Sequence, residues 1–138
     1  MTYTEPTRRA VALALGWEFA PGKPCDLWMD ANGQTAHVGP PPITPADLTA
    51  LNNAALSFMT SEGLNGDSCA CEHCDYHPTT NDGQALALFD LLAVEQQAAA
   101  MHLLIDWRGS VPSWVVDGPP DRPALLTAAA VLASRSAE

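Results

Sequence analysis

The chain has 138 residues, the usual size of one domain, and 47% of them are hydrophobic, which argues against wholesale disorder. Sixteen Asp and Glu outweigh six Lys and Arg, so the formal net charge is −10. This charge repels phosphate backbones and anionic membranes, so it disfavours direct nucleic-acid or membrane binding and favours a basic protein partner. Because the sequence lacks an apolar run of the ~20 residues that a membrane span needs, and a signal peptide, we expect a cytoplasmic protein.

The first third of the chain predicts a helix followed by a β-hairpin. A helix over about residues 6–15 is favoured because Thr4 can cap it and Gly16 can end it in the left-handed conformation. Extended segments are predicted at 17–20, 26–29 and 34–38. The last two flank Asn32-Gly33, the dipeptide most typical of a tight hairpin turn.

The middle of the chain predicts a second helix and a long polar loop. Prolines at 40–42 form a rigid connector, and Thr44, Pro45 and Asp47 then give a helix start that should continue to about Ser61. Residues 63–83 are polar and loop-like. A loop of this length in a compact domain is either functional or internally pinned.

The C-terminal half predicts a third helical stretch over 84–101, a second hairpin and a last helix. The hairpin would pair 102–108 with 112–117, and alternation along its first strand would make Asp106 and Arg108 an ion pair on one face. Asp121 can cap a last helix from Arg122 to about Ser134.

Helices and hairpins in this order predict an α+β fold, in which a small antiparallel sheet of two hairpins packs with three or four helices. A purely helical fold is the main alternative, because alanine-rich segments dominate the sequence. We expect one domain over residues 1–138, with a Cys/His-rich loop insertion at about 63–83.

The insertion holds the densest group of potential metal ligands. Zinc prefers four Cys or His ligands in a tetrahedron, and four residues of this loop could form a structural Cys3His site: Cys69, Cys71, Cys74 and His77. His73 is a spare ligand, and Cys25 is a distant alternative. A second Cys-x-x-Cys half is absent and Cys-x-Cys geometry is cramped, so a disulfide, a redox switch and inert thiols stay open.

Acidic and tryptophan side chains are the candidates for contact with a partner. The sequence contains no nucleotide-binding loop and no nucleophile beside a general base, so we expect no enzymatic activity. Tryptophans in predicted strands are core residues more often than interface anchors. The candidate partner-binding residues are Glu72, Asp75, Asp82, Asp106, Asp117, Trp107 and Trp114.

Three segments together resemble a known family. They are the first helix running into Leu15-Gly16-Trp17, the segment DLWMDANG (26–33) with its proline-rich exit to 44–48, and the terminal helix around PALLTAAA (123–130). On these segments the chain resembles the phage ABA-sandwich domain family. Together they cover about half of the chain, and the cysteine loop is not part of the resemblance. The resemblance implies a phage or prophage accessory protein with helices around a small sheet, and it carries no functional residues.

The charge and the resemblance together predict a non-enzymatic inhibitor of a bacterial defence system, most concretely an anti-CRISPR protein. It would act in the host cytoplasm on a defence complex with a basic surface, and a homodimer stays possible. Two alternatives stay open: a sponge that sequesters a nucleotide signal, which the few cations disfavour, and a zinc-stabilised structural or assembly protein.

Overall fold

The computed structural model describes residues 5–19, 27–29, 35–38, 43–61, 76–108 and 121–135. Within these ranges the helices are α1 (Glu5–Ala14), α2 (Pro45–Ser61), α3 (Asp82–Leu91), α4 (Val94–Arg108) and α6 (Arg122–Arg135). The strands are β1 (Glu18–Phe19), β2 (Leu27–Met29) and β3 (Thr35–Val38). None of these helices is both long and apolar enough to cross a membrane.

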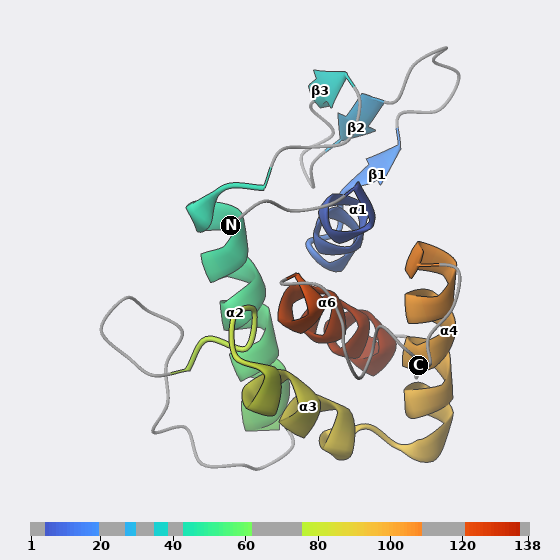
Figure 1. The fold of residues 1–138 in the computed structure, drawn as a ribbon. Helices are drawn as coiled ribbons and strands as arrows, with labels where there is room; N and C mark the ends of the chain where they lie inside the picture. The colour runs from blue at the N-terminus through green and yellow to red at the C-terminus, as the bar shows by residue number, and fades with distance from the viewer. Residues whose placement is uncertain are drawn as a thin grey trace.

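Helix α6 is the centre of the described core. Figure 1 shows it between α1, α2, α3 and α4, and it contacts all four. Most of its side chains are buried, and alanines at 124, 128, 129, 130 and 133 leave little volume between α6 and its neighbours. Small side chains let the four outer helices approach the central helix closely, and larger residues such as Leu125 and Val131 fill the remaining space.

The predicted α+β fold, with a sheet of two hairpins as one layer, is wrong. In the described residues the buried hydrophobic cluster consists almost entirely of helix residues, joined by Tyr76 from the turn before α3. The strands are two to four residues long and lie beyond α1, on the far side from α3 (Figure 1). Four helices packed around α6 therefore form the core of the described residues, and the purely helical alternative describes it better.

The short strands lie where the first hairpin was predicted. They pair antiparallel in the order β1-β2-β3, with Glu18 opposite Met29 and Leu27 opposite Val38. The register shifts between Trp28 and Met29, as at a β-bulge. The predicted turn at Asn32-Gly33 lies outside the described residues.

The end of α1 follows the prediction for Gly16. This glycine has φ +85°, and its N–H donates to the Leu13 carbonyl at 3.0 Å, while the Trp17 N–H donates to the Ala12 carbonyl at 2.9 Å. These two bonds make a Schellman motif, which turns the chain away from the helix axis. A residue with a Cβ would be strained at this φ, which explains why glycine occupies the position.

The start of α2 is a complete capping box. The Thr44 hydroxyl accepts a hydrogen bond from the Asp47 N–H at 3.1 Å, and the Asp47 carboxylate accepts one from the Thr44 N–H at 3.1 Å. Each side chain therefore satisfies a backbone donor that the first turn leaves without a partner. The helix ends at Ser61, as the sequence predicts.

The single helix predicted over 84–101 is two helices. Leu92 has an extended backbone with ψ 144°, and α4 starts two residues later at Val94. The Gln96 side chain accepts the Ala93 N–H at 2.9 Å, and the Gln97 amide donates to the carbonyls of Phe89 and Leu92 at 3.1 Å. Two glutamines thus supply the caps that Ser, Thr or Gly usually provide.

The predicted first strand of the second hairpin, 102–108, is the last part of α4. The buried residues Ala100, Leu104 and Trp107 recur at intervals of four and three, which is the helical period. Alternation within LLIDW is typical of a strand, but the helical spacing of the buried residues continues from Ala100 through this segment. Residues 112–117 lie outside the described ranges.

Candidate protein-binding surface

Several of the predicted site residues lie outside the described residues. These are the three thiols proposed as zinc ligands and four of the proposed partner-binding residues, namely Cys69, Cys71, Cys74, Glu72, Asp75, Asp117 and Trp114. The structure describes His77, Asp82, Asp106 and Trp107. These four belong to different environments.

His77 belongs to a turn that is anchored to three helices. Its backbone N–H donates to the Gln84 side chain of α3 at 2.6 Å. The next residues are buried: the Thr79 N–H donates to Asn52 of α2 at 3.1 Å, and the Pro78 carbonyl accepts the Thr127 hydroxyl of α6 at 2.9 Å. The C-terminal end of the cysteine segment is therefore fixed to the core.

Asp82 is engaged in an ion pair inside the molecule. Its carboxylate accepts two hydrogen bonds from Arg122, one from Nε at 3.1 Å and one from Nη2 at 2.5 Å. The pair joins the first residue of α3 to the first residue of α6. Because Asp82 is 44% exposed at its side chain, water still reaches it.

Trp107 lies in the core with 8% of its surface exposed, so in the described structure it packs against other core residues and is not an exposed interface anchor. The predicted ion pair of Asp106 with Arg108 is wrong, because residues two positions apart on a helix point in nearly opposite directions. Arg108 instead donates from Nη2 to both carboxylate oxygens of Asp121, at 2.7 and 2.8 Å. Asp121 is 1% exposed and also accepts the Thr7 hydroxyl of α1.

The predicted zinc site has no counterpart among the described residues. No group of three His, Cys, Asp or Glu side chains lies close enough there to hold a metal ion. The zinc hypothesis depends on Cys69, Cys71 and Cys74 and stays a prediction. Metal content of the purified chain, measured together with a count of reactive thiols, tests it.

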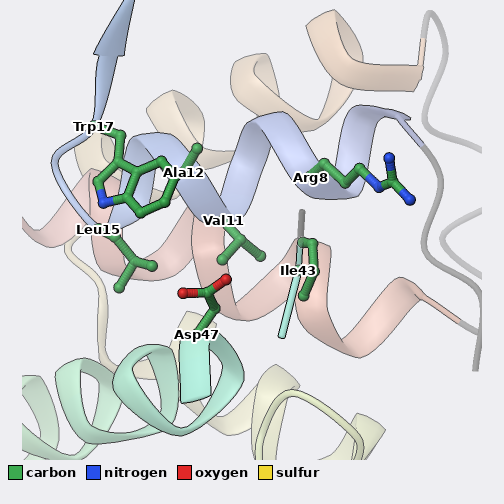
Figure 2. Close-up of a pocket in the computed structure, with 7 residues that line it drawn as sticks. All are labelled: Arg8, Val11, Ala12, Leu15, Trp17, Ile43 and Asp47. Atoms are coloured by element: carbon green, nitrogen blue, oxygen red, sulfur yellow. The ribbon is translucent and has the colours of Figure 1, made fainter. Parts of the chain in front are cut away.

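A small apolar crevice lies between α1 and the start of α2 (Figure 2). Val11, Leu15, Trp17 and Ile43 line it, and it has room for only about 10 Å³. The Asp47 carboxylate points towards Val11, whereas the Arg8 side chain runs away along α1. Because Asp47 already belongs to the capping box and the space holds about one water molecule, this crevice fits no ligand.

A larger groove of about 560 Å³ lies where α1, α4 and α6 meet. Its apolar lining residues are all half-buried: Leu13, Ala99, Leu103 and Leu132. Two exposed polar residues of α4, His102 and Asp106, stand beside them. A groove with an apolar floor and an exposed carboxylate at its edge suits a protein segment with aliphatic and basic side chains.

Sequence reasoning identified Asp106 but missed the groove that it borders. With 102–108 predicted as a strand, Ala99 and Leu103 fell in different elements. The positions 99, 102, 103 and 106 are three or four residues apart, and this spacing is the signal that indicates one face of a helix.

Comparison with family models, with curated proteins and with solved structures found no match to this chain.

Proposed function

We propose that this chain is a non-enzymatic binding protein that inhibits a larger protein complex by occupying a basic surface of that complex. In its most specific form it is a phage or prophage protein that blocks a bacterial defence system in the host cytoplasm, such as a CRISPR effector. The biological setting rests on the resemblance to phage accessory proteins. The mode of action rests on charge.

The observation that carries the proposal is the use of the cations. Of the six in the sequence, Arg108 and Arg122 pair with carboxylates of the same chain, and Arg135 donates to the Ala14 carbonyl at 2.5 Å. Each of the two ion pairs cancels one carboxylate, which leaves the formal net charge at −10. The net charge of −10 is thus carried by side chains such as Asp90, Glu95 and Asp106, all exposed.

The same use of cations disfavours the nucleotide-sponge alternative. A phosphate site needs several Arg, Lys or backbone N–H donors directed at one point. Arg108, Arg122 and Arg135 instead hold α4, α3 and α1 to α6. Repulsion from the carboxylates would also weaken binding of a free nucleotide and of nucleic acid.

Phage plating tests the proposed function. The chain is expressed in bacteria that carry an active CRISPR system, and the efficiency of plating of a targeted phage is measured. We expect plating to rise by orders of magnitude, and to stay unchanged in a matched strain without the CRISPR system. Unchanged plating in both strains would contradict an anti-CRISPR role.

Charge reversals then test the mode of action. Replacing Glu72, Asp75, Asp106 and Asp117 together by Lys should abolish the rise in plating, because the basic surface of the complex would no longer be attracted. Asp82→Asn is the internal control, since its carboxylate pairs with Arg122. Full inhibition by the reversed protein would contradict the electrostatic mode.

A further inference from the structure

We infer that the groove between α1, α4 and α6 binds an amphipathic helix of the partner, with the helix's basic edge lying along α4. This inference rests on the proposed function and names the surface that would perform it. It follows from the lining of the groove and from the positions of the two exposed carboxylates of α4, Asp106 in the lining and Glu95 further along the helix.

The groove offers an apolar floor that the described elements leave open. Leu13, Leu103 and Leu132 come from three different helices that contact one another, so their positions are fixed by the core. Ala99 is one turn before Leu103 on α4 and also lines the groove. Its side chain is small and leaves room for a bound side chain. A volume of about 560 Å³ accommodates several aliphatic side chains of one helix face.

Two carboxylates of α4 lie on the side of the helix that borders the groove. Glu95 and Asp106 are eleven residues apart, which is three helical turns or about 16 Å, so both lie on one side of α4. Both are exposed, and neither forms an ion pair with a described residue. They would meet Lys or Arg side chains three turns apart on a bound helix.

The charges beside the groove set the orientation of the occupant. Among the described residues that line the groove, Asp106 is the one carboxylate, and it belongs to α4 together with Glu95. The groove therefore favours a helix with Lys or Arg on the edge that faces α4.

Two synthetic peptides and the full-length chain test the inference. The first peptide is an 18-residue amphipathic helix with a leucine and alanine face and Lys along one edge, and the second has Glu in place of each Lys. Binding is measured by fluorescence anisotropy at low salt. We expect the Lys peptide to bind at least tenfold more tightly than the Glu peptide.

Matched variants locate the binding to the groove. Asp106→Lys should weaken binding of the Lys peptide by about threefold to tenfold, whereas Asp90→Lys, the same change at an exposed position of α3, should weaken it less than twofold. Ala99→Gln should also weaken binding, because its larger side chain occupies the floor. Circular dichroism confirms that each variant is folded, and the two aspartate variants test the groove even if Ala99→Gln unfolds.

Three results would overturn the inference. Equal losses for Asp106→Lys and Asp90→Lys would mean that the peptide responds only to overall charge, which leaves the proposed function standing. Tight binding of the Glu peptide would reverse the predicted partner chemistry. A concentration-dependent dimer that Ala99→Gln abolishes would make a second copy of this chain the occupant. Failure of the proposed function itself would appear separately, as unchanged phage plating.

Discussion

The Asp121 side chain joins helices that are far apart in the sequence. It stands just before α6, is 1% exposed, and binds Arg108 of α4 and Thr7 of α1. The sequence identified it only as a helix cap. Its carboxylate instead faces two other helices, which ties α1, α4 and α6 together at one point.

Removing this carboxylate should lower stability far more than removing an exposed one. We expect Asp121→Ala to lower the free energy of unfolding by about 3 kcal/mol, because the Arg108 guanidinium would be left without its charged partner. Asp82→Ala breaks the more exposed pair with Arg122 and should cost about 0–1 kcal/mol. Urea denaturation measures both, and equal losses would contradict a special role for Asp121.

Tyr76 makes stability depend on pH in the alkaline range. Its hydroxyl is buried without a hydrogen-bond partner among the described residues, and burial raises its pKa to about 12 from 10.0. Below pH 10 the phenol is protonated in both the folded and the unfolded chain, so its stability contribution is fully present. Between pH 10 and 12 the unfolded chain releases this proton while the folded chain keeps it, so the free energy of unfolding falls. The loss should be about 1.4 kcal/mol per pH unit over that interval.

Tyr76→Phe isolates this effect from other groups that titrate at high pH. The variant should be at least as stable as the parent at pH 7, since no described acceptor loses a donor. Above pH 10 its free energy of unfolding should fall less steeply than that of the parent. Parallel slopes for the two proteins between pH 10 and 12 would show that Tyr76 ionises as an exposed tyrosine does.

At the scale of elements, the capping box of α2 is the feature that sequence and structure share most closely. Thr44→Ala removes the acceptor for the Asp47 N–H and should lower the free energy of unfolding by about 1 kcal/mol. Thr49→Ala is the control, because its hydroxyl donates to the Pro45 carbonyl within the same helix and caps no helix end. Thermal melts of both variants compare the two, and an equal or larger loss for Thr49→Ala would contradict the capping role.

Helix α6 should tolerate extra volume less than an outer helix. Ala129 is fully buried, so Ala129→Leu should cost about 1–3 kcal/mol through displaced neighbours. Ala98→Leu makes the same change at an exposed position of α4 and should leave stability within about 0.5 kcal/mol. Denaturation curves measure both, and a stable Ala129→Leu variant would mean that space remains around α6.

Local signals in the sequence predicted the elements that have their own caps and turns. Gly16 and the Thr44–Asp47 box mark helix ends correctly because their chemistry is local. Asp121 does precede α6, but its carboxylate binds Arg108 and Thr7 of two other helices. The break at Leu92 was missed because Gln96 and Gln97 cap it. The predictions of an α+β fold and of a second hairpin were wrong. Residues 102–108 are helical because Leu104 and Trp107, at helical spacing, are buried in the core that α4 forms with α6.

The candidate groove was less predictable than the helices. Leu13, Leu103 and Leu132 are 29 to 119 residues apart in sequence, and only packing around α6 brings their helices together. The sequence could supply Asp106 as an acidic candidate, but it could not show that the residue borders an apolar floor. The sequence likewise could not show that Arg108 pairs with Asp121, which is thirteen residues further along the chain and in contact only through packing of α4 on α6.

At the scale of the whole molecule, the surplus of negative charge opposes folding. With a net charge of −10 and three cations engaged internally, the surface carboxylates repel one another. Salt screens such repulsion between exposed charges over about 10 Å at 0.1 M. Raising NaCl from low to moderate concentration should therefore raise Tm, by about 4 °C for each kcal/mol of repulsion removed.

A neutralised variant separates screening from other effects of salt. Replacing Asp90, Glu95 and Asp106 by their amides removes three of the sixteen carboxylates and brings the net charge from −10 to −7. Its Tm at low salt should exceed that of the parent, and its rise with NaCl should be smaller. If the Tm of the parent does not change with NaCl, repulsion between the surface carboxylates does not oppose folding. If repulsion is present, a basic partner should relieve it on binding, so the partner's affinity and the salt dependence of Tm should decline together in this variant.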